Sequence, residues 1–361
     1  MRVGLIVNPL AGLGGPLALK GSDNELGWRA LQLGAVPKAG DRATTALRSV
    51  NKTKLNLVTS AGAMGELSAI AAGFEARVVH AAGGESSSDD TVAAAEAIAC
   101  AGVDLLLFAG GDGTARDLMR AEIGQLPLLG IPAGVKMHSA VFATSPSSAG
   151  AAISELVEGG KLVSGPAEVI DRDPIDGTPR LYGLLQSLQF ARRQVAKASS
   201  PAACDAQLLA EARTVAGELR RSPLAMIGPG ATMLAVKDAL GAGGTLIGVD
   251  AYAYGELVAA DADAAALIAL CRDRPPRIVL GVVGGQGFLL GRGNQQLSAG
   301  VVRLAGPSGL TVLAASDKLA VFAGGALLVD SGDPVLDQML AGYIPVRTGP
   351  RRTTMMRVDP A

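Results

Sequence analysis

The chain has 361 residues, a formal net charge of −1 and 3% aromatic residues. It is long enough for two domains, and it lacks both the positive charge and the aromatic surfaces that favour binding to nucleic acid or an anionic membrane. The three cysteines, Cys100, Cys204 and Cys271, have no paired C-x-x-C spacing. This argues against a disulfide framework or a structural zinc site and favours a soluble protein of the reducing cytoplasm.

The N-terminal part of the chain alternates short aliphatic runs with helical segments. A helix is predicted at Asp89–Ala101, with Ser88 or Asp89 as its cap. The alternation predicts a Rossmann-like α/β fold, a parallel sheet with helices on both faces, in which ligands bind beyond the carboxyl ends of the strands. The predicted strands are Val3–Val7, Lys54–Thr59, Ala76–His80, Val103–Phe108 and Leu126–Ile131.

The first predicted strand is followed by the glycine-bearing loop VNPLAGLGG, which contains Asn8, Gly12, Gly14 and Gly15. Residues without a Cβ let the backbone approach a phosphate closely, which makes these four residues candidates for phosphate binding. A tight turn between a strand and a helix explains the same spacing.

The fourth predicted strand is followed by FAGGDGTARD, in which Gly110, Gly111 and Gly113 surround Asp112, and Thr114 comes next. An acid in a loop suited to phosphate repels the ligand unless a cation offsets its charge or the carboxylate accepts a proton from an attacking hydroxyl. Asp112 is therefore a candidate catalytic base. The alternative is that it caps the following helix.

After about residue 151 the alternation weakens and then resumes. Ala167–Ile170 and Leu181–Leu185 are predicted to form a hairpin with Asp176-Gly177 in its loop, and a helix is predicted at Ala206–Arg220. The β/α alternation returns from Leu224 in LAMIGPG, TLIGVD, RIVLGVVGG and LTVLAAS. We therefore predict an N-terminal domain at residues 1–154 and a second, mixed α/β domain at residues 155–361. The last segment is a candidate for packing back on the first domain.

Several motifs together resemble one family. GGDGT at Gly110–Thr114 resembles the signature of the superfamily of NAD kinases, diacylglycerol kinases and sphingosine kinases, and VNPLAG is similar to its N-P-x-[SA]-G start. LKGSD, GIPAGVKMHSAVFA, GPGAT, TLIGVDA and GGQGFLLGRGNQQLS extend the resemblance over nearly the whole chain. The chain thus resembles the ATP-NAD kinase family in its AcoX-like branch, named for a protein associated with acetoin catabolism.

The resemblance implies an NAD kinase-like fold and an ATP-dependent phosphotransferase with an alcohol acceptor. NAD(H) phosphorylation at the 2′-hydroxyl in NADP biosynthesis is the leading activity, with Mg²⁺ as cofactor, a cytoplasmic location and self-association into a homo-oligomer. Asp112 matches the acid regarded as the proton acceptor in NAD kinases, and the glycines around it match the phosphate-holding loop. Gly134, Lys136 and Ser139 become candidates for nucleotide contact, and no metal ligand is assigned.

The second half of the chain supplies further candidates. GPGAT opens a predicted helix, Asp250 ends a predicted strand, and Arg292 lies in a loop rich in hydrogen-bond donors. Capping explains Asp250 equally well, and His138 is interpreted as structural. The nucleotide-binding candidates here are Gly228, Gly230, Thr232, Asp250, Gly285, Arg292 and Asn294.

The sequence also departs from the NAD kinase pattern. The Asn-Glu pair that grips the ribose is missing from its expected region, and Asn24-Glu25 comes far too early. GPGAT is at best a distant counterpart of T-P-T-G-S-T-A-Y. Two alternatives therefore stand beside NAD phosphorylation: a kinase of another hydroxyl-bearing metabolite, and a nucleotide-binding sensor without turnover.

Overall fold

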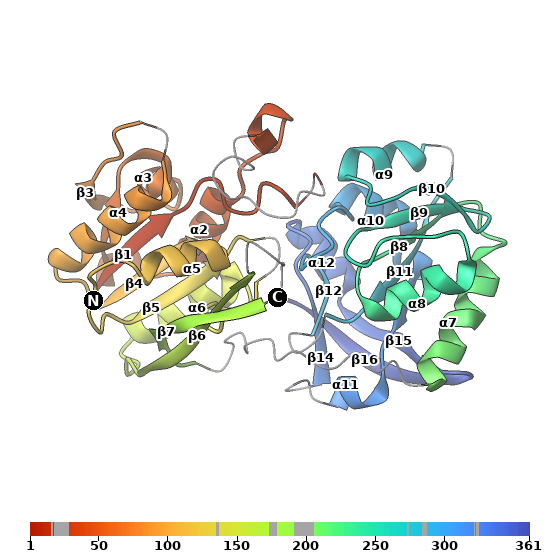
Figure 1. Ribbon diagram of the computed structural model, residues 1–361. Coiled ribbons are helices and arrows are strands. Elements are labelled where there is room, and N and C mark those ends of the chain that lie inside the picture. Colours follow the sequence, from red (N-terminus) through yellow and green to blue (C-terminus); the bar gives the residue numbers. More distant parts are fainter. Residues whose placement is uncertain are drawn as a thin grey trace. The chain divides into compact units, whose positions relative to one another are not determined.

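The chain is seen in a computed structural model that describes residues 1–15, 17, 29–84, 86–134, 137–172, 179–190, 206–272, 274–283, 287–320, 322 and 325–361. It divides into two compact units, the first made of Met1–Gly14 and Gly21–Lys197 and the second of Gly15–Lys20 and Ala198–Ala361. Each unit has its own β-sheet (Figure 1).

The first sheet has seven strands in the order β3-β2-β1-β4-β5-β7-β6. Neighbouring strands are parallel except β6 and β7, which form an antiparallel hairpin. The strands are β1 (Arg2–Val7), β2 (Asn56–Ser60), β3 (Ala76–His80), β4 (Leu105–Gly110), β5 (Leu128–Pro132), β6 (Ser164–Arg172) and β7 (Pro179–Leu188). The predicted Rossmann-like sheet is confirmed, and all five predicted strands are present with ends within two residues of the prediction.

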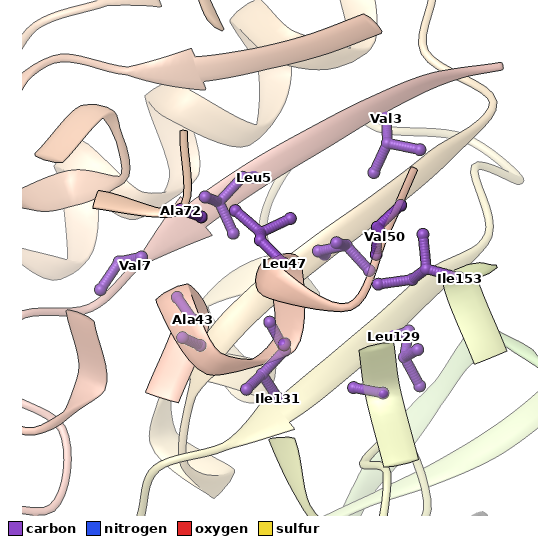
Figure 2. Close-up of a cluster of buried hydrophobic side chains, with 14 of the residues drawn as sticks. Val3, Leu5, Val7, Ala43, Leu47, Val50, Ala72, Leu129, Ile131 and Ile153 are labelled. Carbon is purple, nitrogen blue, oxygen red and sulfur yellow. The ribbon is translucent and has the colours of Figure 1, made fainter. Parts of the chain in front are cut away.

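Helices cover both faces of this sheet because successive side chains of a strand point to opposite faces. Leu5 packs on one face with side chains of α2 (Ala39–Arg48), α3 (Glu66–Ala71) and α6 (Pro146–Val157), as Figure 2 shows in part. Ile6 packs on the other face with side chains of α4 (Ser88–Cys100) and α5 (Asp112–Leu118). The cap of α4 is Ser87, one residue before Ser88, the nearer of the two predicted caps, and its side chain accepts a hydrogen bond from the Asp90 N–H.

The strand order reverses direction beside β1. The chain passes from β1 to β2 and β3 on one side, then returns to β4 and β5 on the other. In open α/β sheets, ligands bind beyond the carboxyl ends of strands at such a topological switch point. The loops after β1 and β4 are the two that contain the glycines and Asp112.

The predicted hairpin is confirmed, but it belongs to the first sheet. β7 pairs with β5 at Ser187 and Leu128, and β6 pairs with β7 along its length. Because these pairings join the hairpin to the edge of the parallel sheet, the first unit ends at Lys197 and not at residue 154. The hairpin loop carrying Asp176-Gly177 lies outside the described residues.

The second sheet has nine strands in the order β10-β9-β8-β11-β13-β15-β16-β14-β12 and is mixed, with both parallel and antiparallel pairs. The last segment of the chain forms β15 and β16 within it. The strands are β8 (Ala225–Ile227), β9 (Asp250–Ala253), β10 (Glu256–Ala259), β11 (Arg277–Gly281), β12 (Phe288–Leu290), β13 (Leu310–Leu313), β14 (Ala326–Val329), β15 (Gly342–Gly349) and β16 (Arg352–Pro360).

Helices also cover both faces of the second sheet. α7 (Ala206–Leu219) and α8 (Ala231–Leu240) contribute to one apolar core, and α9 (Ala264–Leu270), α10 (Ala299–Ala305), α11 (Ser316–Ala320) and α12 (Pro334–Leu340) contribute to the other. Short 3₁₀ turns lie at Lys52–Lys54, Gly62–Met64 and Pro307–Gly309. No helix of the described residues is long and apolar enough to cross a bilayer.

One predicted strand of this unit is displaced. The run TLIGVD was expected to be extended, but the strand begins at its last residue, Asp250, and runs antiparallel to β8. Gly243 and Gly244 have positive φ, which turns the chain, and the residues from Thr245 to Gly248 wrap around the buried Lys237 and Asp250 side chains.

Candidate functional site

Three loops meet beyond the carboxyl ends of β1, β4 and β5. The Asn8 N–H donates to the Ala109 carbonyl at 2.9 Å, which ties the first loop to β4. The Ala133 and Gly134 N–H groups donate to the Gly110 carbonyl at 2.8 and 3.1 Å, which ties the third loop to the second. The two glycine loops singled out in the sequence therefore lie together with the turn after β5.

These loops approach so closely that two contacts require glycine. A Cβ on Gly12, whose φ is +79°, would lie 2.0 Å from the Ala133 carbonyl oxygen. A Cβ on Gly134 would lie 2.8 Å from the Gly111 Cα, closer than real Cβ atoms come to their neighbours. The glycines thus allow backbone to pack against backbone here, which also leaves the loop surface free of side chains.

Asn8 and Thr114 hold the first two loops together. The Asn8 Nδ2 donates to Thr114 Oγ1 at 2.9 Å, and its Oδ1 accepts from the Leu10 N–H at 3.0 Å. Thr114 is buried, and its hydroxyl also accepts from the Gly111 N–H at 3.4 Å. Their side chains thus connect the loop after β1 to the start of α5. Gly14 follows in the first loop, Gly113 is the second residue of α5, and Gly15 is the first residue of a segment assigned to the second unit.

Asp112 is the first residue of α5 and is 5% exposed. Its Oδ2 accepts from the His138 N–H at 2.6 Å. Its Oδ1 accepts from the Ser139 N–H at 3.0 Å and from the Ser139 hydroxyl at 2.6 Å. These three hydrogen bonds come from the segment after β5 and not from α5, so helix capping does not explain them.

Burial raises the pKa of Asp112 to about 7, because removal from water disfavours the charged carboxylate. The three hydrogen bonds from Ser139 and His138 lower this pKa, and the negative charge of Asp171 raises it slightly. The Asp112 side chain can consequently exchange a proton near neutral pH, as a general base of an enzyme must.

A charged rim lies beside Asp112, and the sequence reasoning did not find it. Arg116 Nη1 lies 3.1 Å from Asp171 Oδ2, and the Arg116 guanidinium lies 5.4 Å from the Tyr182 ring centre. The four-residue spacing from Asp112 to Arg116 puts both on one face of a helix, a signal that was available. No local pattern links Arg116 to Asp171, because α5 and β6 are far apart in the sequence and only the fold brings them into contact.

Ser139 was expected to contact the nucleotide directly. The structure instead encloses it completely, with its hydroxyl bonded to Asp112 and to the Ile170 backbone. Lys136, expected to neutralise a phosphate, lies outside the described residues.

Gly228, Gly230, Thr232 and Asp250 lie in the second unit. The Gly230 N–H donates to the Leu246 carbonyl at 2.8 Å, so it is already engaged. Asp250 is wholly buried and accepts from Lys237 Nζ at 2.8 Å, from the Thr245 N–H and hydroxyl, and from the Asp261 N–H. All four bonds come from the protein itself, so the Asp250 side chain organises the loop before β9.

Arg292 and Asn294 follow β12 in the same unit. The Asn294 side chain donates to the Leu289 carbonyl at 2.7 Å and accepts from the Gly291 N–H at 2.9 Å, which closes the loop. Arg292 is buried, with its guanidinium 4.8 Å from the Phe288 ring centre and 3.7 Å from the Asp330 carboxylate. Gly285 lies outside the described residues.

Comparison with known proteins identifies a family for both parts of the chain. A family model of the ATP-NAD kinase N-terminal domain matches residues 3–161, and one of the ATP-NAD kinase C-terminal domain matches residues 224–358. No curated protein and no solved structure matches the chain significantly. The chain therefore belongs to the ATP-NAD kinase family and is a phosphotransferase with an alcohol acceptor.

Proposed function

We propose that this kinase transfers the γ-phosphoryl group of ATP to the 2′-hydroxyl of NAD or NADH, with Asp112 as the proton acceptor. The observation that carries the proposal is the buried Asp112 carboxylate, which titrates near neutrality at the topological switch point of a parallel sheet. Membership of the ATP-NAD kinase family supports ATP and NAD as the two substrates.

The proposed reaction needs a base and a surface for phosphate. The acceptor oxygen attacks the γ-phosphorus, the bond from that phosphorus to the bridging oxygen of ADP breaks, and the hydroxyl proton passes to Asp112. Gly12, Gly111 and Gly134 keep side chains away from the loop surface, so backbone N–H groups can approach phosphate oxygens. The hydrogen bonds from Ser139 and His138 hold the carboxylate in one orientation throughout.

Magnesium would enter with ATP. The described part of the chain contains no group of three histidine, cysteine or acidic side chains able to hold a metal. This suits Mg²⁺, which is usually held by substrate phosphates and water with few protein ligands. When bound, the ion neutralises charge on the phosphates. The cytoplasmic location and the self-association remain predictions from the sequence.

A second candidate function differs from the first in its phosphoryl acceptor. The sequence has its only Asn-Glu pair at Asn24-Glu25, outside the described residues, so the pair that grips the ribose in NAD kinases is missing from its expected region. This favours a second candidate, a kinase with the same chemistry that acts on another hydroxyl-bearing metabolite of the AcoX-like kind. A sensor that binds nucleotide without turnover is the third candidate.

Mass spectrometry of the products tests the proposal. Wild-type protein and the Asp112→Asn variant are incubated with Mg-ATP and either NAD or NADH. NADP or NADPH should form with the wild type, and the variant should turn over about 10²- to 10⁴-fold more slowly, since it has lost its base. ATP binding, measured by calorimetry, should be largely retained in the variant.

Asp89→Asn is the matched control, because it removes the same charge from an exposed site in the same unit, where an ion pair with Arg120 contributes little. It should keep wild-type turnover. If neither NADP nor NADPH appears while ATP binds, NAD as acceptor is refuted, and a panel of nucleosides and polyols separates another kinase from a sensor. Full activity of Asp112→Asn would refute the role of the acid.

A further inference from the structure

Ser139 lies where three parts of the first unit meet. It is 0% exposed and belongs to the segment from Met137 to Ala143, whose residues run beside both β5 and β6. Its hydroxyl oxygen lies 2.6 Å from Asp112 Oδ1, 3.0 Å from the Ile170 nitrogen and 3.0 Å from the Ile170 carbonyl oxygen. We propose that Ser139 is a positioning residue whose hydroxyl fixes the Asp112 carboxylate and couples it to the backbone of β6.

The hydroxyl has one proton and two acceptors within reach. It accepts from the Ile170 N–H, so its own proton can go either to Asp112 or to the Ile170 carbonyl. An ionised Asp112 is the stronger acceptor, and 2.6 Å is the distance expected for a hydroxyl bonded to a carboxylate. When Asp112 carries a proton, it can donate that proton to Ser139, and the hydroxyl then turns to the Ile170 carbonyl.

The network is therefore satisfied in both protonation states of Asp112. A buried polar group that loses its hydrogen-bond partner costs free energy. Without Ser139, protonation of Asp112 in each turnover would leave such a group unpaired. Ser139 removes that cost by reversing one hydrogen bond without moving the backbone. This role rests on the proposed function for its catalytic meaning, but the coupling itself is a property of the folded chain.

Other charged and hydrogen-bonding groups around Asp112 also affect its pKa. Asp171 at the end of β6 faces it as a negative charge, which Arg116 of α5 partly offsets at 3.1 Å. The His138 N–H donates to the second carboxylate oxygen, and Asp117 lies farther along α5. None of these is changed by a substitution at Ser139, so the contribution of its hydroxyl can be isolated.

The test is a titration of Asp112 in the full chain. Carboxyl carbons of aspartate are labelled with ¹³C, and the Asp112 signal is assigned by its loss in Asp112→Asn. Ser139→Ala removes a donor to the carboxylate and should raise its pKa by about one unit, and Ser139→Thr should restore the wild-type titration. Ser187→Ala is the matched control, since Ser187 is equally buried and its hydroxyl has no hydrogen-bond partner among the described residues.

Kinetics give a second readout that a merely structural role would not produce. If Asp112 is the base, Ser139→Ala should reduce kcat about fivefold at neutral pH and regain most of it about two pH units higher, because the limb of the pH profile moves with the pKa. An unchanged or lowered pKa of Asp112 in Ser139→Ala would overturn the proposal. So would a loss of kcat that is the same at every pH.

Two designs keep the outcome clear. If Ser139→Ala does not fold, Ser139→Cys carries the test, since a thiol is a weak donor and should raise the pKa of Asp112 by a smaller amount. If no kinase product is ever found, the titration still decides the coupling, because it needs no substrate. Failure of the coupling and failure of the proposed function are therefore distinguished.

Discussion

At the scale of single residues, the burial of Asp112 has a thermodynamic consequence. Its pKa is about 7 in the folded chain and 3.8 in a solvated carboxyl, so between these values the native state holds a proton that the unfolded state has released. Burial makes the Asp112 carboxylate a stronger base, because it lacks the water that would stabilise its negative charge. The charged carboxylate that the proposed reaction requires therefore lowers folding stability.

This predicts how stability depends on pH. As pH rises from about 4 to about 7, ionisation of Asp112 should lower the free energy of unfolding, by about 4 kcal/mol for a shift of about three units, and the effect should level off above that range. Urea denaturation of the wild type and of Asp112→Asn over this range measures it. The difference between the two curves isolates Asp112 from other carboxyls, and parallel curves would contradict the raised pKa.

Residue chemistry made Asp112 a candidate base but did not indicate its partners. An acid between glycines after an aliphatic run is an unusual local combination, so Gly110–Thr114 could be singled out. Ile170 carries no polar side chain, and its role depends on backbone groups whose partner is 31 residues away. No local pattern reveals such a contact, and the resemblance to NAD kinases had instead made Ser139 a candidate for direct contact with the nucleotide.

At the scale of elements, the strands of the first sheet could be predicted from the sequence. The position of β9 in the second sheet could not. Strands β1 and β4 are buried on both faces, so they appear in the sequence as continuous aliphatic runs. The run before β9 looks the same, but Lys237 and Asp250 form a buried ion pair that the adjoining loop must enclose. Electrostatics therefore overrode hydrophobic pattern at that strand.

The contact between the second and third loops predicts the effect of one added methyl group. Gly134→Ala places a Cβ 2.8 Å from the Gly111 Cα, and backbone cannot move aside as a flexible side chain does. We expect a loss of about 1–3 kcal/mol in unfolding free energy together with weaker binding of Mg-ATP.

Thermal denaturation and calorimetry check this prediction. Gly83→Ala serves as the control, because an added Cβ there meets nothing within 4 Å, and stability should stay within about 0.5 kcal/mol of wild type. Wild-type affinity for Mg-ATP in Gly134→Ala would show that the close approach of the loops is unimportant for the ligand.

At the scale of the molecule, the hairpin decides where the first unit ends. The alternation of predicted strands and helices weakens after about residue 151, which is why the sequence placed the domain boundary at residue 154. The pairing of β7 with β5, and the Ala140 N–H donating to the Glu168 carbonyl at 2.8 Å, carry the unit on to Lys197. Pairing between distant segments has no signature in local composition.

Truncation tests this boundary. A fragment of residues 1–197 contains both apolar cores of the first sheet and should unfold cooperatively on its own. A fragment of residues 1–154 lacks β6 and β7, which removes the Ile170 partners of the Ser139 hydroxyl and the strand that pairs with β5, and it should lack a cooperative transition. Circular dichroism during urea denaturation distinguishes them, and equal behaviour of the two would place the boundary at 154 after all.

The dependence of Ser139 on Ile170 also sets a time order during synthesis. A ribosome makes the chain from its N-terminus, and domains tend to fold as units while they emerge. The strands β1 to β5 and the glycine loops leave the ribosome before the hairpin does. In a nascent chain, Asp112 and Ser139 are therefore made before the Ile170 backbone that Ser139 bonds, so the link from Asp112 to β6 forms only after β6 has been translated.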